Sequence, residues 1–197
     1  MLTCPNGCRL SIAPGFFLLL AVFFYLDQGM GFLKWYGLAA CLHETGHILA
    51  AKLLGGQVKR LSLSVVGAEI RFDYHRILSY GEENLVALAG PVVNLLVGVA
   101  AGTRIPLLAV ANFGMGAFNL LPVMPLDGGR VLSNVLSEAF GVSVSDNILL
   151  ASAGLISGIL LGLGLILTVC YANVVLLILS AWILLGSIWK NNDFSSK

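Results

Sequence analysis

The sequence predicts an all-α polytopic membrane protein with about six transmembrane helices and a short membrane-associated β-hairpin between the second and the third. Apolar residues make up 58% of the 197-residue chain and charged residues only 11%, whereas about a quarter of the residues in soluble domains are charged. Several apolar runs approach the ~20 residues that a helix needs to cross the hydrocarbon of a bilayer. One stretch between these runs alternates β-branched and polar residues instead, which favours strands.

Six apolar runs bounded by charges or turn residues are the candidate spans, and together they form a single predicted domain. The first run is short and follows Arg9, so a cleaved signal peptide is the competing interpretation. No small-residue cleavage site follows this run, and Asp27-Gln28-Gly29 is typical of a turn, so we interpret it as a helix. The spans are residues 12–26, 32–54, 85–101, 105–121, 148–169 and 172–189 of the domain 1–197.

The lysines and arginines near the helix ends set the expected orientation, because cytoplasmic loops are enriched in them. With six spans and the N-terminus inside, only Lys34 and Arg104 of the 11 basic residues lie outside. Both termini are therefore predicted to be cytoplasmic. The net charge of +1 gives no indication of a nucleic-acid partner. The basic residues on the cytoplasmic side are Arg9, Lys52, Lys59, Arg60, Arg71, Arg76, Arg130, Lys190 and Lys197.

The second span contains the segment His43-Glu44-Thr45-Gly46-His47, although ionisable groups are costly there unless they have a function or a partner. In a helix, His43 and His47 lie one turn apart on one face, and Glu44 projects beside them. This HExxH arrangement is typical of a Zn²⁺ site in which both imidazoles bind the metal and the glutamate takes a proton from water. A pair of core histidines bonded to a neighbouring helix is the alternative.

The HExxH motif also has a predicted depth in the membrane. His43 precedes Lys52 by nine residues, which places the motif roughly 13 Å below the cytoplasmic end of its helix. We therefore expect a site within the bilayer that opens toward the cytoplasmic side.

Residues 57–74 differ from the rest of the chain, because β-branched residues alternate imperfectly with serine and charge around Gly67-Ala68. This pattern predicts a β-hairpin. Open strand edges are not tolerated facing lipid, so the hairpin should line a polar cavity or lie at the interface. Its edge is then able to pair with an extended peptide. A solvated hairpin without a binding role fits the sequence equally well.

Two later spans are interrupted by polar residues. In Gly90-Pro91-Val92-Val93-Asn94, an asparagine places an amide in a membrane helix, so Asn94 should face the protein interior, for local packing or for an active-site contact.

After the fourth span, the two prolines and the Gly-Gly of residues 119–130 predict an unwound segment. Asp127 in this segment is the candidate third zinc ligand. Its alternative role is the N-cap of a short amphipathic helix that we expect to run to Gly141.

Cys4 and Cys8 precede the first span. With a cytoplasmic N-terminus they are expected to be reduced thiols and not a disulfide. Their CxxxC spacing matches the usual zinc-binding pairs poorly, so we place no second metal site there.

HETGH in the second span and NLLPVMPLDGGR after the fourth together resemble the site-2 protease family of intramembrane zinc metalloproteases. Six spans place the resemblance nearest the branch of the sporulation peptidase that processes a pro-sigma factor. The resemblance implies that His43, His47 and Asp127 bind Zn²⁺ and that Glu44 is the catalytic base. Soluble zincins fit less well, since a metzincin needs a third histidine where this chain has Leu53.

The same resemblance extends to the elements around the metal. It implies that Asn119 lies near the metal and positions substrate or stabilises the oxyanion. GPVVN resembles the GPxxN element of the family, which adds Asn94 to the candidate site residues. Residues 57–74 resemble the re-entrant hairpin with which the family pairs its substrate.

The activity implied by the resemblance is hydrolysis of a peptide bond in or near a transmembrane segment of a membrane-bound protein or peptide. The expected partners are this substrate, the lipid bilayer and a separate regulatory membrane protein, while the oligomeric state is left open. We expect no CBS or PDZ domain within residues 1–197, so substrate selection should come from the membrane core or from a partner.

The sequence leaves two alternatives to a protease open. One is a member of the same fold that binds metal or sequesters substrate without turnover, although Glu44 is present and metal binding alone does not require it. The other is a small transporter, since broken helices and buried polar residues also mark ion paths. The six spans show no inverted pair of interrupted segments, which argues against transport.

Overall fold

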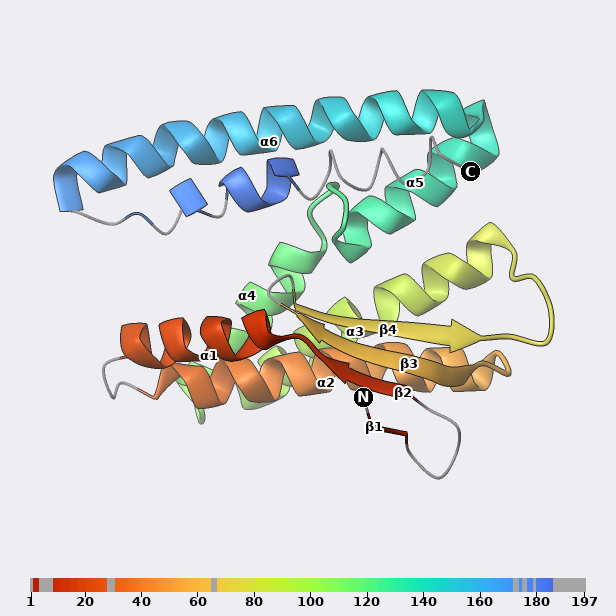
Figure 1. The fold of residues 1–197 in the computed structure, drawn as a ribbon, viewed down its shortest axis with the longest axis horizontal. Helices are drawn as coiled ribbons and strands as arrows, with labels where there is room; N and C mark the ends of the chain where they lie inside the picture. Colours follow the sequence, from red (N-terminus) through yellow and green to blue (C-terminus); the bar gives the residue numbers. More distant parts are fainter. Residues whose placement is uncertain are drawn as a thin grey trace. The chain divides into compact units, whose positions relative to one another are not determined.

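The computed structural model describes residues 2–3, 9–27, 31–64, 67–171, 174, 177–178 and 180–185. Within these residues, four strands and six helices follow one another along the chain (Figure 1). The chain forms two compact units, residues 1–117 and residues 118–197. Each unit positions different candidate site residues.

The first unit contains a four-stranded sheet with the strand order β1-β2-β3-β4. Strand β2 pairs antiparallel with β1 and parallel with β3, and β3 pairs antiparallel with β4. The predicted hairpin is confirmed as β3 and β4. The strands are β1 (Leu2–Thr3), β2 (Arg9–Ile12), β3 (Gln57–Ser64) and β4 (Gly67–Asp73).

The described chain is mostly helical, as predicted, but its sheet is larger than the predicted hairpin. Residue 12 was placed at the start of the first span, but it ends β2, and the Ala13 N–H donates to Leu63 O at 2.8 Å. The cause is tertiary: the short segment Arg9–Ile12 is stabilised as a strand by parallel pairing with β3, and parallel partners are far apart in sequence.

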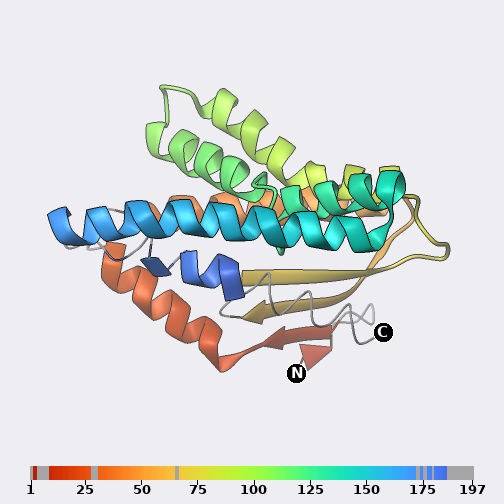
Figure 2. The same cartoon turned by 90° about the horizontal axis from the view of Figure 1, so that it is seen from above.

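Four helices accompany the sheet, and three of them match predicted spans closely. They are α1 (Pro14–Asp27), α2 (Phe32–Leu53), α3 (Tyr80–Ala101) and α4 (Pro106–Asn119). The sheet packs against α2, while α1 contacts both β3 and α2 (Figures 1 and 2). Since α2 carries HETGH, the sheet lies beside the helix of the candidate site.

Helix α3 begins five residues before the predicted span of residues 85–101, and its N-terminus explains why. Ser79 is the N-cap and its hydroxyl accepts from the Glu82 N–H at 3.3 Å, while the Glu82 carboxylate accepts from the Ser79 N–H at 3.0 Å. This capping box satisfies two N–H groups that the helix leaves unpaired. Glu82 and Glu83 also lie in the first turn, where acidic residues complement the helix dipole. The polar start therefore belongs to the helix although it lies outside the apolar run.

The second unit contains α5 (Asp127–Phe140) and α6 (Val142–Tyr171). The short helix predicted after Asp127 is confirmed as α5. The Ser145 hydroxyl of α6 donates to Ser133 O of α5 at 3.1 Å, which ties the two helices together. Val123, Ala153 and Ile183 form the buried core of this unit, and the ring of Phe118 packs beside Trp182.

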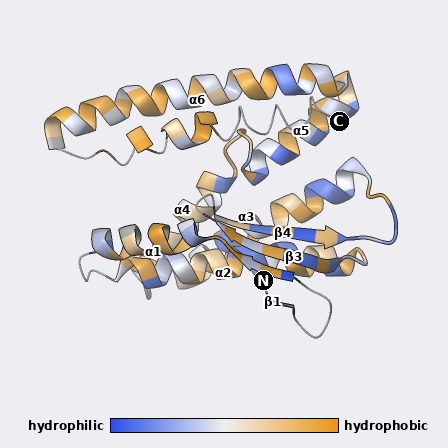
Figure 3. Ribbon diagram, viewed as in Figure 1, coloured by the Kyte–Doolittle hydropathy of each residue, from blue (hydrophilic) through white to orange (hydrophobic). Residues whose placement is uncertain are grey.

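Among the helices that the structure describes, two are long and apolar enough to cross a membrane: α3 and the Val142–Cys170 part of α6. Figure 3 shows the hydrophobic colouring along most of α6. Helices α1 and α4 have 14 residues each, fewer than the ~20 that a straight span requires. The predicted span 172–189 lies largely outside the described residues, as do Cys4 and Cys8. The number of six spans is therefore not confirmed by the structure.

Candidate metal centre

His43 and His47 converge on the side of α2 that faces α3. Both side chains are buried, with 5% and 6% of their surface exposed. Their rings lie edge to face, and the two Nε2 atoms are 3.0 Å apart. The one-turn spacing of the motif thus brings two potential metal-binding nitrogens together.

The other ring nitrogen of each histidine has a hydrogen-bond partner on α3. His47 Nδ1 lies 2.7 Å from Val86 O, and His43 Nδ1 lies 2.7 Å from Asn94 Oδ1. Carbonyl oxygens accept hydrogen bonds and cannot donate them, so Nδ1 carries the proton in both rings. In the neutral form of both rings, each Nε2 then presents a lone pair toward the other ring. This is the pattern of metal-binding histidines, whose second ring nitrogen is held by a carbonyl or carboxylate.

Two lone pairs facing each other at 3.0 Å repel unless a cation lies between or beside them. Two nitrogens that bind one tetrahedral Zn²⁺ at about 2.05 Å lie about 3.3 Å apart. The observed separation is close to this value, so the imidazole pair suits a metal ion. Histidines that only stabilised a neighbouring helix would not need to turn both Nε2 atoms together.

Glycines make the space that the imidazoles occupy. A Cβ atom at Gly90 would lie 2.5 Å from His47 Nε2 and 2.8 Å from His43 Cε1. A Cβ atom at Gly46 would lie 2.6 Å from Ala89 O, so Gly46 allows α2 and α3 to approach at this level. Any larger residue at position 90 would fill the region in which the nitrogens converge.

Glu44 follows His43 on α2 and is half-buried. The hydroxyl of its neighbour Thr45 donates to Cys41 O at 2.7 Å, so this hydroxyl is used within the helix itself. The carboxylate of Glu44 belongs to the groups that can act as a general base.

Asp127 lies in the second unit, at the first position of α5. The N-cap is Leu126 and makes no side-chain capping bond, so the alternative role of Asp127 as an N-cap is wrong. The carboxylate is buried, with 6% of its surface exposed, and its Oδ1 lies 3.7 Å from Arg130 Nη1. A buried acidic side chain is rare unless it pairs with a cation or binds a metal.

The unwound segment before Asp127 is confirmed, and its backbone folds against the start of α5. Val123 N–H donates to Leu121 O at 2.8 Å, and Leu126 N–H donates to Val123 O at 2.9 Å. The Ser152 hydroxyl of α6 lies 2.6 Å from Pro122 O. A Cβ atom at Gly129 would lie 2.6 Å from Met124 N. The glycines after Asp127 therefore serve close packing of the segment, beyond the sharp turn expected from sequence.

The two candidate asparagines lie in different surroundings. Asn119 is the last residue of α4 and is half-buried. Asn94 is fully buried behind His43, and its Nδ2 donates to Ala39 O at 3.0 Å and to Asn112 Oδ1 at 2.8 Å. Because both N–H groups of Asn94 are used, this residue has no donor left for an oxyanion. Its hydrogen bond with the candidate site is the one to His43 Nδ1.

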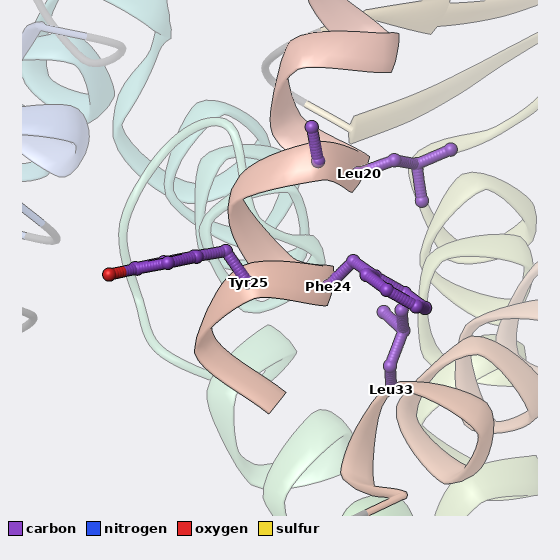
Figure 4. Close-up of a pocket in the computed structure, with 5 residues that line it drawn as sticks. Leu20, Phe24, Tyr25 and Leu33 are labelled. Carbon is purple, nitrogen blue, oxygen red and sulfur yellow. The ribbon is translucent and has the colours of Figure 1, made fainter. Parts of the chain in front are cut away.

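An apolar groove in the first unit has none of this chemistry. It is lined by Leu20, Ala21, Phe24 and Tyr25 of α1 and by Leu33 of α2. Figure 4 shows Phe24 beside Leu33, while the Tyr25 ring points the other way. The candidate centre is therefore the buried histidine pair and not this groove.

Comparison with known proteins agrees with the prediction from the two motifs. Residues 100–163 match the model of peptidase family M50. The chain is 30% identical over 159 residues to zinc metalloprotease MJ0392 of Methanocaldococcus jannaschii, an alignment that covers 74% of this chain and 45% of the relative. It is 33% identical over 123 residues to putative zinc metalloprotease sll0528 of Synechocystis, covering 56% of this chain and 32% of the relative.

Two further matches concern the predicted branch and the fold. The chain is 29% identical over 111 residues to stage IV sporulation protein FB of Bacillus subtilis, covering 51% of this chain and 38% of that protein. A solved structure of a site-2 protease from Methanocaldococcus jannaschii superimposes with a TM-score of 0.72 at 24% identity, covering 96% of this chain and 94% of the other.

These matches confirm the resemblance predicted from HETGH and NLLPVMPLDGGR: residues 100–163 are similar to peptidase family M50, the relatives are named zinc metalloproteases, and the fold is that of a site-2 protease. The alignments span less than half the length of the curated relatives. The site-2 proteases are membrane proteins, and the two long apolar helices fit that class.

Proposed function

We propose that the protein is a zinc-dependent intramembrane endopeptidase that hydrolyses peptide bonds in or near a transmembrane segment of a membrane-bound substrate. The observation that carries this proposal is the convergence of His43 Nε2 and His47 Nε2, with both Nδ1 atoms held by carbonyl oxygens. This is a site built for a metal ion on the helix that also carries Glu44. The relatives named zinc metalloproteases support zinc as the ion.

In this proposal His43, His47 and Asp127 hold the zinc ion. Two imidazoles and one carboxylate, all buried, form a suitable donor set, and catalytic zinc commonly takes three protein ligands. The ion, when bound, supplies a Lewis acid that makes a water nucleophilic near neutral pH. Glu44 takes the proton of this water and passes it to the leaving amine. Asn119 is proposed to position the substrate or to donate to the oxyanion of the scissile carbonyl.

The sheet offers a way to hold the substrate. A peptide bond inside a helix has its backbone groups paired, so the substrate must unwind before it can be cleaved. In the described sheet β4 is an edge strand, with β3 as its hydrogen-bonded neighbour. We propose that an extended substrate segment pairs with this edge, as peptides do in β-augmentation.

The chain is proposed to be multi-pass, with both termini in the cytoplasm and the metal site opening toward the cytoplasmic side. Support comes from the basic residues, of which only Lys34 and Arg104 fall outside in this arrangement. A membrane-bound regulatory precursor is a suitable substrate class, and a separate membrane protein is the proposed regulator.

The test is cleavage of a membrane peptide reconstituted together with the purified protein. Glu44→Gln should retain zinc and lose at least about 10²-fold in rate, because it removes the general base. Asp127→Ala should lose both zinc and cleavage. A chelator should abolish wild-type cleavage and added Zn²⁺ should restore it. Full activity of Glu44→Gln would contradict the assigned base.

The same experiment separates the non-catalytic alternative. A protein that only bound metal or sequestered substrate would retain zinc and peptide without forming product, in the wild type as in Glu44→Gln. The presence of Glu44 in the motif favours turnover.

A further inference from the structure

Asn112 is a fully buried polar residue of α4 that neither the metal nor the substrate is expected to touch. Its Oδ1 accepts from Asn94 Nδ2 at 2.8 Å, and its own Nδ2 donates to Leu108 O at 2.9 Å. Burying an amide among apolar helices is costly unless its polar atoms are paired. The pairing here connects Asn112 through Asn94 to His43.

Asn112, Asn94 and His43 form a series of hydrogen bonds, and two backbone carbonyls fix the direction of each bond in the series. Leu108 O can only accept, so the Nδ2 of Asn112 faces it and the Oδ1 of Asn112 faces Asn94. Ala39 O can also only accept, and it takes the second N–H of Asn94. With both N–H groups committed, Asn94 must present its Oδ1 to His43.

The orientation of the Asn94 amide therefore decides which nitrogen of His43 carries the proton. In the observed orientation His43 Nδ1 donates to Asn94, so Nε2 is unprotonated and able to bind a metal. If the amide turned over, its N–H groups would face Nδ1 and favour the Nε2–H tautomer. That tautomer would point a proton at His47 and could not bind a metal.

We propose that Asn112 is a positioning residue, which acts through Asn94 to hold His43 in the Nδ1–H tautomer that metal binding requires. The inference builds on the proposed metal-binding role of His43, but the tautomer is measurable without any metal. His47 needs no such relay, because Val86 O holds its Nδ1 directly. The two histidines of the motif therefore differ in how their tautomers are fixed, and His47 serves as an internal reference.

The experiment is NMR of metal-free protein in detergent micelles with ¹⁵N-labelled histidine, at a pH above the ordinary histidine pKa of about 6.5. The sequence has three histidines, which makes assignment by single substitution practical. In the wild type, the ring ¹⁵N shifts should show the Nδ1–H tautomer for both His43 and His47. In Asn112→Leu, His43 should shift toward Nε2–H while His47 stays unchanged, and zinc affinity should fall about tenfold.

Asn112→Asp is the rescuing variant. A carboxyl group at this position keeps an acceptor oxygen toward Asn94, so the His43 tautomer and the zinc affinity should stay near those of the wild type. Ala111→Val is the packing control, because it enlarges a buried neighbour on the same helix without changing the relay. It should lower the melting temperature and leave the His43 tautomer as it is.

Two results would overturn the proposal. One is a wild-type spectrum with His43 in the Nε2–H form, a measurement that needs no variant to fold. The other is a folded Asn112→Leu protein with the wild-type tautomer and zinc affinity. Failure of the proposed protease function would look different, because cleavage would then be absent in the wild type while its His43 tautomer remained Nδ1–H.

Discussion

The imidazoles of His43 and His47 can converge only because residue 90 lacks a Cβ atom. Gly90 lies on α3 opposite the histidine pair, and an added methyl group would contact both rings within 2.8 Å. Neither ring can move back freely, because each Nδ1 is hydrogen-bonded to α3. The glycine and the two hydrogen-bond acceptors, all on α3, therefore define the space that the two rings occupy.

Gly90→Ala should consequently lose metal while keeping its helix. Alanine favours a helix by about 1 kcal/mol over glycine, so α3 itself should not be weakened. The methyl group should separate the two Nε2 atoms and lower zinc affinity at least about tenfold. Metal content after dialysis against a zinc buffer measures the effect. Gly81→Ala in the same helix is the matched control, since its methyl group meets no described atom within 4 Å.

At the residue scale, the sequence indicates the histidine pair because two imidazoles one turn apart in an apolar span are costly unless they bind a partner. It does not indicate how their tautomers are fixed. Val86 acts through its backbone carbonyl, which every residue possesses, so no sequence signal exists for it. Asn112 could have been found, because an amide in an apolar run is the same signal that identified Asn94.

At the scale of elements, the segment from Leu120 to Leu126 is held in place by specific contacts. It folds back on the first turn of α5, and the Ser152 hydroxyl holds Pro122 O from α6. Gly129 lets the backbone of Val123 and Met124 approach α5, since a Cβ atom would lie 2.5 Å from Val123 O and 2.6 Å from Met124 N. The position of Asp127 depends on this contact, because it begins the helix against which the segment packs.

Gly129→Ala should therefore shift the position of Asp127 indirectly, through the packing of the segment before it. The new methyl group meets backbone atoms, which cannot rotate away as a flexible side chain would, so we expect a loss of roughly 1–3 kcal/mol of stability. Amide hydrogen exchange of residues 120–130 should accelerate, and cleavage should fall with it. Gly154→Ala in α6 should change neither, because its methyl group meets no described atom within 4 Å. Equal amide exchange rates in both variants would show that the packing of residues 120–130 does not depend on Gly129.

The elements also show which parts of the fold can be predicted from the sequence and which cannot. Apolar runs locate α2 and α4 to within about two residues, since hydrophobicity is a local property. The start of α3 depends on the Ser79 capping box, which lies outside its apolar run. Strand β2 depends on pairing with β3, a contact between segments separated by two helices in the sequence. Patterns within one segment contain no information about such a partner.

At the scale of the whole molecule, the proposed metal draws its ligands from distant parts of the sequence. The histidines belong to residues 1–117, whereas Asp127 belongs to residues 118–197. An ion that binds only the folded protein stabilises it by mass action, by about 4 kcal/mol when its free concentration is a thousand times Kd. Metal binding should therefore contribute to the stability of the protein as well as to catalysis.

Zinc removal should lower the melting temperature of the detergent-solubilised protein, and titration with buffered free Zn²⁺ should raise it again as the logarithm of the concentration. His47→Ala and Asp127→Ala should each abolish this dependence, because either change removes a proposed ligand. Glu44→Gln should preserve it, because Glu44 is proposed as the base and not as a ligand. A zinc-dependent melting temperature that survives in Asp127→Ala would exclude this carboxylate from the metal site, although the histidine pair would remain. A melting temperature independent of zinc in the wild type would contradict the metal site itself.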